Sequence, residues 1–497
     1  MSFGSAFWRS ALAAEPTTVG LGPYGALMPP DANGIMLPKG FTSRVVARSL
    51  QAVPNTSYVF PLFPDGAATY ATPDGGWILA VNSEVPETGG ASGLRFDQAG
   101  RITSAYRILE NTSTNCAGGP TPWGTWLSCE EVDKGLVWEC DPTGAKPAVA
   151  RPALGTFKHE AACVDPERQR LYLSEDLVGS GLYRFTPEAY PDLSRGRLEI
   201  ACDGAMGKVI WKEVPDPAAT SKPTRQQVEN ILPFARGEGI WFDSGIVYLA
   251  TTSDETIHAY DTRTETIEIL YRADDVENAP LRGVDNLHVS RSGDLFVAED
   301  SYSNDPDALD VCLITPDREV SRFLKLTGSQ HRYPGEAESE TAGLCFDPSG
   351  TRLYFGSQRG FGFGVVYEVT GPFRQSRPTG VPGQGTPLGL DVAKQLRLGV
   401  FGRRGLPVRF TLDDAATVEL KLTARVANRT VTLARATREV DRGSETLRLR
   451  APKRTLRRLR TRRSGLRARL EVRVITPGED DRVLRRTVRL TRKARKR

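Results

Sequence analysis

The sequence lacks several features that would place it in a common class of protein. No run of 18 apolar residues occurs among its 497 residues, so no segment is expected to cross a membrane as a helix. Its seven cysteines form neither a CxxC pair nor a zinc-binding spacing, and Cys163 and Cys345 fall in apolar patterns typical of buried thiols. Amphipathic helical patterns are scarce, whereas glycine (48) and proline (34) are plentiful. Turns and strands are therefore expected to dominate the fold.

The first 15 residues, MSFGSAFWRSALAAE, lack the positively charged start and the long apolar core of an export signal. They nevertheless contain "ALAA", which resembles a signal-peptidase site. Residues 1–15 are therefore either a disordered arm or the remnant of an export signal that starts upstream, and we expect the second. This reading predicts a protein that is secreted or associated with the cell envelope.

Charge is divided unevenly along the chain. Residues 391–497 contain 32 Lys and Arg against 11 Asp and Glu, a net charge of +21, whereas the remainder contains 33 against 49, a net of −16. An acidic body is thus joined to a basic tail, which predicts two parts with different partners.

A phrase of turn, short apolar strand and acidic or polar residue recurs six times in the acidic body. The first copy is "FPDGAATYATPDGGWILAVNSE", and the third is "VDPERQRLYLSED". The copies end at Glu84, Glu131, Asp176, Asp254, Asp300 and Gln358, at intervals of 47, 45, 78, 46 and 58 residues. Four of these intervals suit a four-stranded blade, and the longest allows an insertion.

The repeat predicts an all-β fold in which residues 16–372 form a six-bladed β-propeller. Equivalent strand ends of a propeller converge on one mouth of the central channel, so the acids that end the copies should lie close together. Crowded carboxylates repel one another in a partly desolvated site, and a bound hard cation removes that penalty. The repeat therefore predicts a metal site at the channel mouth.

The basic tail is predicted to be a separate domain. Residues 373–390 are rich in proline and glycine and read as a linker, and residues 391–497 alternate polar and apolar residues as a small antiparallel β-sandwich does. The tail resembles the Arg-rich immunoglobulin-like modules of secreted proteins. Its surface suits an anionic cell-envelope polymer, or else serves only as a solubilising face. Aromatic residues are few in the tail, so nucleic acid is not an expected partner.

Four stretches of the body, in this order, resemble the PhoX-type alkaline phosphatase family. They are "NCAGGPTPWGTWLSCEE", "FKHEAA", "VDNLHVSRSGDLFVAED" and "ETAGLCFDPSGTRLYF". The resemblance extends over residues 16–372. It implies a propeller exported through the twin-arginine route, with iron and calcium at the channel mouth and hydrolysis of phosphate monoesters as the reaction.

The resemblance also implies a ligand set. Both cysteines of the first stretch are candidate thiolate ligands, and the sequence does not separate them. With Glu238, an acid that follows a glycine in "ARGEG", the expected metal ligands are Cys116, Cys129, Glu130, Glu131, Glu160, Asp176, Glu238, Asp285, Asp300 and Glu340. Among them, the residues expected to be catalytic are Glu130, Glu160 and Glu340.

Other polar residues of these stretches are assigned differently. Glu175 and Glu299 precede the aligned acids and should point to the opposite face, and His159 reads as a structural histidine. Trp123 and Trp126 are expected to pack in the core. 

The family also uses an arginine to hold the phosphate, and the turn before Glu340 reads "EAES" without one. Arg282, Arg332 and Arg359 lie in loops that could replace it, but none of them matches the family pattern. Two other functions therefore stay open: a calcium-dependent lactonase-type hydrolase, and a non-catalytic calcium-stabilised propeller that binds the cell envelope.

Overall fold

A computed structural model describes residues 17–300, 309–331 and 339–376, and residues 389–491 except 393–394, 399, 402–404, 413–415, 427–428, 441–442, 453–454, 457–465 and 476–481. The chain divides into two compact units, Ser2–Arg377 and Pro378–Arg497. The predicted export remnant and most of the predicted linker lie outside the described residues. In the part of the chain that is described, no helix is long and apolar enough to cross a membrane.

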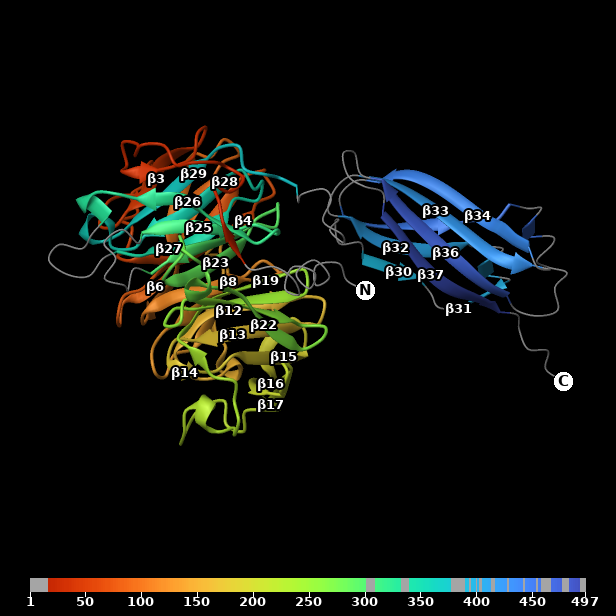
Figure 1. Cartoon of the computed structure of the whole chain (residues 1–497), viewed down its shortest axis with the longest axis horizontal. Helices are drawn as coiled ribbons and strands as arrows, with labels where there is room; N and C mark the ends of the chain where they lie inside the picture. The colour runs from red at the N-terminus through yellow and green to blue at the C-terminus, as the bar shows by residue number, and fades with distance from the viewer. Residues whose placement is uncertain are drawn as a thin grey trace. The chain divides into compact units, whose positions relative to one another are not determined.

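The described residues of the N-terminal unit form six sheets of at least four strands each. Consecutive strands pair antiparallel within each sheet, as expected for short apolar runs joined by tight turns. The first strand of each sheet contacts the first strands of the neighbouring sheets, so these strands close a ring near the middle of the unit (Figure 1). This arrangement confirms the predicted all-β, propeller-type fold.

The strands of the six sheets follow one another along the chain. The first three sheets comprise β4 (Pro64–Ala71), β5 (Trp77–Ser83), β6 (Gly89–Phe96) and β7 (Ile102–Thr112); β8 (Asn115–Pro120), β9 (Trp126–Glu130), β10 (Val137–Cys140) and β11 (Val149–Ala150); and β12 (His159–Asp165), β13 (Arg170–Glu175), β15 (Tyr183–Ala189), β16 (Asp192–Asp203) and β17 (Val209–Glu213). The last three comprise β19 (Gly237–Asp243), β20 (Ile246–Thr251), β21 (Thr256–Asp261) and β22 (Thr266–Arg272); β23 (Val284–Val289), β24 (Leu295–Glu299), β25 (Asp310–Ile314) and β26 (Glu319–Leu326); and β27 (Thr341–Phe346), β28 (Arg352–Ser357) and β29 (Val365–Thr370).

The start of the chain completes the last two sheets. Strand β3 (Thr42–Arg48) pairs antiparallel with β29, so it supplies the outer strand of the sixth sheet. Strands β1 (Thr18–Val19) and β2 (Ile35–Met36) both pair with β26. Backbone hydrogen bonds between the two ends of the unit thus close the ring and cover strand edges that would otherwise be exposed.

Apolar side chains pack between neighbouring sheets. Trp77 and Phe96 of the first sheet stack with ring centroids 5.2 Å apart, and they pack against Cys345 and Tyr354 of the sixth sheet. Cys163 packs in the same way between the third and fourth sheets. Burial of both cysteines confirms the prediction that they are apolar core residues.

One irregularity recurs at the same place in all six sheets. Near its beginning, the first strand slips in register against the second strand, as a β-bulge does. The slips fall at Pro64/Ala67, Asn115/Gly118, His159/Ala162, Gly237/Ile240, Val284/Leu287 and Ala342/Cys345. Bulges turn side chains out of the regular alternation, and the residue after each slip begins is Asp65, Cys116, Glu160, Glu238, Asp285 or Gly343.

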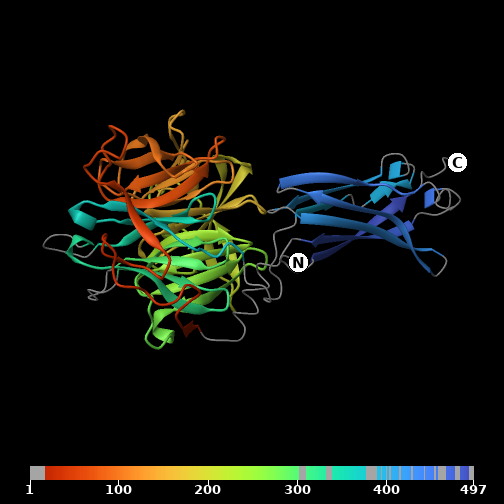
Figure 2. The ribbon, with the colours of Figure 1, turned by 90° about the horizontal axis from the view of Figure 1, so that it is seen from above.

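The described residues of the C-terminal unit form two sheets. One contains β30 (Gly389–Val392), β32 (Leu406–Leu412) and β35 (Gly443–Leu449), and the other contains β31 (Gln395–Arg397), β37 (Arg482–Thr491), β36 (Leu466–Ile475), β33 (Ala416–Val426) and β34 (Arg429–Val440). Leu406 and Leu449 of the first sheet share one apolar core with Leu420 and Leu470 of the second. Figure 2 shows these strands, drawn in blue, in two layers.

Candidate functional site

The acidic residues of the N-terminal unit meet at one edge of the ring of first strands. Within a sheet, the start of the first strand pairs with the end of the second, as Pro64 pairs with Ser83 and Asn115 with Glu130. The residues next to these pairs, Asp65 with Glu84 and Cys116 with Glu131, are therefore neighbours. The corresponding residues of the other sheets are Glu160 and Asp176, Glu238 and Thr252, Asp285 and Asp300, and, one pair further along, Glu340 and Gln358.

Three groups of potential ligands, two of which share Glu84, lie within this ring, which we call the acidic mouth. In each group the ligand atoms all lie within 4.8 Å of one another. The groups are Glu84, Cys116 and Glu131; Asp65, Glu84 and Glu340; and Glu160, Glu238 and Asp285. A fourth group contains Glu299, Asp310 and Cys312. It is separate from the mouth, because Glu299, at the end of β24, points away from it. The structure therefore brings six of the predicted ligands together with Asp65 and Glu84, and all six sheets contribute.

Burial and mutual repulsion raise the pKa values of these acids. Burial is the largest cause, and it raises the pKa of Asp65 to about 6, of Glu84 to about 7 and of Glu131 to about 8. The pKa values of Glu160, Glu238, Asp285 and Glu340 lie well above the usual range for the same reason, with neighbouring carboxylates adding to the shift. Burial likewise raises the pKa of the Cys116 thiol. Ionised acids in this arrangement need a positive partner.

One carboxylate oxygen of the acidic mouth has no hydrogen-bond partner. Glu160 is fully buried, and its Oε1 accepts a hydrogen bond from Cys116 Sγ at 3.2 Å, but Oε2 is unsatisfied. An unpaired buried oxygen is costly, and a cation would satisfy it. Carboxylates suit hard cations such as Ca²⁺, and a thiolate among them suits iron. The donor set therefore fits the two predicted metals.

Two basic side chains neutralise one side of the mouth. Lys158 Nζ lies 2.7 Å from Glu131 and 3.2 Å from Asp176. Arg236 holds both oxygens of Asp176, at 2.7 and 2.9 Å, and reaches Glu238 at 2.9 Å. These bonds outweigh burial and lower the pKa of Asp176, in contrast to its neighbours. Asp176 thus serves to hold the two basic groups in place.

Asn82 fixes the backbone around Cys116. Its side-chain amide donates to the carbonyl oxygens of Cys116 at 3.0 Å and Ala117 at 2.8 Å. Its carbonyl accepts from Trp126 Nε1 and Ser128 Oγ, both at 2.8 Å. Trp126 is buried, as predicted for a core aromatic residue, and through Asn82 it also helps to position the bulge that carries the thiol.

Cys129 and Glu130, both predicted as ligands, lie outside the groups of the acidic mouth. Glu130 accepts hydrogen bonds from the backbone amides of Ser113 at 3.0 Å and Leu136 at 3.1 Å, and from Trp138 Nε1 at 3.1 Å. Cys129 is buried in an apolar cluster between sheets. Side chains alternate along a strand, so only Glu131 of the Cys-Glu-Glu run faces the mouth.

Glu175 and Glu299 occupy the same strand position as Glu130, and they also point away from the mouth. Glu175 bonds to Tyr183 and Arg225, and Glu299 accepts from the backbone amides of Arg282 and Asp310. His159 is buried with Nε2 3.1 Å from the Gly155 carbonyl oxygen, as expected for a structural histidine.

Several polar residues of the mouth are not among the predicted ligands. They are Asp65, Glu84, Lys158, Arg236, Thr252 and Gln358. Glu84 and Gln358 end two copies of the repeat, so the repeat indicated their position at the mouth without marking them as ligands. Asp254, which ends the fourth copy, accepts from Thr251 instead, and Thr252 donates to Glu238 at 3.0 Å. Asp65 lies in a bulge, and no sequence pattern marks that bulge.

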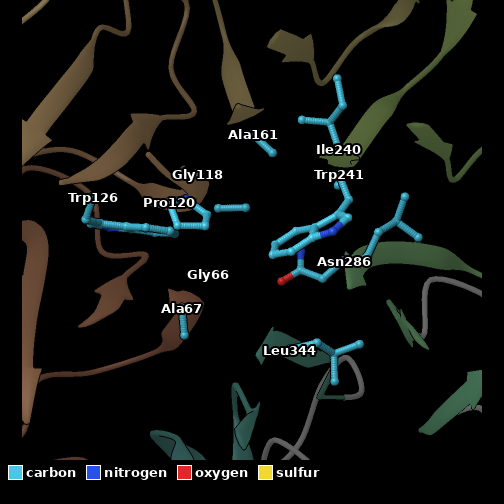
Figure 3. A pocket seen from close by; sticks show the side chains of 13 residues that line it. Gly66, Ala67, Gly118, Pro120, Trp126, Ala161, Ile240, Trp241, Asn286 and Leu344 are labelled. Atoms are coloured by element: carbon cyan, nitrogen blue, oxygen red, sulfur yellow. The ribbon is translucent and has the colours of Figure 1, made fainter. Parts of the chain in front are cut away.

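Residues from the first strands of the six sheets line a narrow cavity (Figure 3). Its volume is about 30 Å³, room for little more than a water molecule. Small residues such as Gly118 and Gly239 bring the strands close together: a Cβ on Gly118 would lie 1.9 Å from the Leu127 carbonyl oxygen. A substrate therefore has no room inside the ring and would have to bind at the mouth.

Comparisons with known proteins bear on this site. The sequence pattern of one family, described as alkaline phosphatase PhoX, matches residues 79–137 and 132–360. No curated protein matches the chain. A solved structure of a protein of unknown function from Bacteroides thetaiotaomicron is similar at 11% identity, with a TM-score of 0.42, over 66% of this chain and 76% of that one. The RRP9 WD40 repeats are similar at 11% identity, with a TM-score of 0.38, over 70% of this chain and 100% of that one. The family match spans more than half of the sequence, and the chain belongs to the alkaline phosphatase PhoX family.

Proposed function

We propose that this protein hydrolyses phosphate monoesters at an iron- and calcium-dependent site in the acidic mouth. Membership of the PhoX family supports a phosphatase-type hydrolase. The observation that carries the finer assignment is the packing of Glu84, Cys116 and Glu131 within 4.8 Å, beside two all-carboxylate groups. A thiol among acids distinguishes this site from a simple calcium site.

In this proposal, the group with Cys116 holds iron and the all-carboxylate groups hold calcium. Bound cations of this kind act as Lewis acids toward phosphate oxygens. Glu160 and Glu340, predicted as catalytic, orient the cluster as ligands, and the unsatisfied Glu160 Oε2 supports that role. Lys158 and Arg236 keep Asp176 ionised and limit the number of cations that the mouth needs.

Elemental analysis of the purified protein, a visible spectrum and p-nitrophenyl phosphate turnover test this function together. We expect iron and calcium, an absorption band from thiolate bound to ferric iron, and turnover that a chelator abolishes. The Cys116→Ser variant should lose the band, whereas Cys129→Ser should keep it. Calcium without iron, no band and no turnover would contradict the proposal.

We further propose export by the twin-arginine route, with the basic C-terminal unit holding an anionic polymer of the cell envelope. Exposed basic residues gather on one face of the sheet that contains β33 and β36: Lys421, Arg435, Arg467, Arg469, Arg473 and Arg489. Glu419 and Glu471 interrupt this basic face. Fractionation of cells that express the natural gene would contradict export if the protein stayed in the cytoplasm.

A further inference from the structure

We propose that Arg359 binds the phosphate group of the substrate at the acidic mouth, an inference that rests on the proposed function. A phosphate dianion that enters a ring of carboxylates needs positive charge close to the bound metals. The described basic side chains at the mouth are Lys158, Arg236 and Arg359, and they differ in what holds them.

Lys158 and Arg236 are already committed to acids. Lys158 lies between Glu131 and Asp176, and Arg236 spans Asp176 and Glu238. Binding phosphate through either residue would leave buried carboxylates without their partners, which is costly.

Arg359 is held by an aromatic ring. Its Cζ lies 5.0 Å from the centroid of Phe63, and no ion pair joins Arg359 to a carboxylate among the residues that the structure describes. A cation stacked on a ring keeps its planar N–H donors for another acceptor, and a guanidinium binds phosphate oxygens in a bidentate fashion.

The backbone places Arg359 beside the predicted ligands. Its amide donates to Ser339 Oγ at 2.9 Å, and the amide of the preceding Gln358 donates to the Glu340 carbonyl oxygen at 3.0 Å. The Gln358 side chain bridges Asp65 and Glu84, with 2.7 Å to each. Arg359 therefore directly follows Gln358, which is bound to two acids of the mouth.

The ring that holds Arg359 is itself tied to the mouth. The Phe63 carbonyl oxygen accepts from the Glu84 amide at 2.9 Å, and the Phe63 amide donates to the Phe363 carbonyl oxygen at 2.9 Å. Phe63 has a φ of 49°, a left-handed conformation that is unfavourable for a bulky residue. Such strain is retained where the surrounding structure requires it, which is common at ligand sites.

Electrostatics agree with this placement. Burial raises the pKa of Glu84 and of Asp300, and the positive charge of Arg359 partly opposes the rise in both. The charge of the guanidinium therefore acts on acids of two different sheets.

The test uses the metal-loaded full chain and two variants of one loop. Arg359→Ala removes the proposed ligand. Arg48→Ala is the matched control, because Arg48 stacks on Phe361 of the same loop, with Cζ 3.8 Å from the ring centroid, but belongs to the outer strand β3. The measurements are metal content, the Kd of inorganic phosphate by calorimetry, and kcat and KM for p-nitrophenyl phosphate.

We expect Arg359→Ala to raise the phosphate Kd and KM at least tenfold, roughly the loss of one charge-assisted hydrogen bond, with metal content unchanged. Arg359→Lys should recover part of the affinity, and Arg48→Ala should match the wild type. Unchanged phosphate binding in Arg359→Ala, an equal loss in Arg48→Ala, or loss of metal from Arg359→Ala would each overturn the assignment. If Arg359→Ala weakened phosphate binding but the wild type did not hydrolyse p-nitrophenyl phosphate, the proposed function alone would be overturned.

Discussion

At the scale of single residues, one step along a strand decides which acids face the mouth. Glu130 and Glu131 are adjacent, yet the first accepts three hydrogen bonds outside the mouth and the second lies within 4.8 Å of Glu84 and Cys116. The end of β9 and the loop after it therefore carry a structural acid and a candidate ligand side by side. The pair offers a matched test, because both changes replace a carboxylate by an amide of the same size.

Glu131→Gln should weaken metal binding, whereas Glu130→Gln should lower stability. The first removes a proposed ligand, and we expect metal affinity to fall by at least about 10–100-fold, the loss known for residues that only support ligands. The second places an amide group against the Ser113 N–H, so we expect the free energy of unfolding to fall by about 1–3 kcal/mol while metal content stays the same. Metal titration and urea unfolding measure both, and loss of metal from Glu130→Gln would contradict the assignment.

At the scale of elements, strand alternation divides each sheet into a packed and an exposed face. In β36, Leu466, Ala468 and Leu470 are buried, whereas Arg467 and Arg469 are exposed. Neighbouring strands lie about 4.8 Å apart and alternate residues about 6.8 Å apart, so the exposed arginines form a flat basic grid. Such a grid can contact a polymer with regularly spaced negative charges without stacking on bases.

We expect R467Q/R469Q to weaken the binding of inorganic polyphosphate and to lower the slope of log affinity against log salt by about 1–2. The control is R195Q/R197Q, which changes an equivalent exposed pair on strand β16 of the N-terminal unit. Equal losses in both variants would indicate non-specific charge attraction. Much tighter binding of duplex DNA than of polyphosphate would contradict the proposed envelope partner.

At the scale of the whole molecule, ring closure concentrates negative charge that no single sheet holds. Asp65 and Glu340 come from opposite ends of the N-terminal unit's sequence, yet they belong to one group of ligands because the first and sixth sheets are neighbours. Folding therefore forces these acids together, and without metal their burial works against folding.

The metal-free protein should lose stability as the pH rises from about 6.5 to 8. Over this range the folded state binds more protons than the unfolded state, because burial raises the pKa of Glu84 to about 7 and of Glu131 to about 8 from ordinary values near 4.5. Unfolding therefore becomes easier as the pH rises. Urea unfolding of chelator-treated protein at both pH values should reveal this loss, and added calcium should reduce it. A chelated protein that is equally stable at pH 6.5 and pH 8 would show that the acids carry no such cost.

The sequence alone determined the class of fold, the repeat and the family motifs. Strand periodicity and turn residues are local properties, so the six copies could be read directly, and they led to Glu131, Asp176 and Asp300. Only the tertiary structure decided which side chains share one site. Asp65 and Gln358 are joined at 2.7 Å although 293 positions separate them, and a bulge that no pattern marks turns Asp65 toward the mouth. Cys116 and Cys129 likewise lie in different surroundings, because the direction of a side chain depends on pairing between strands that is settled only when the ring closes.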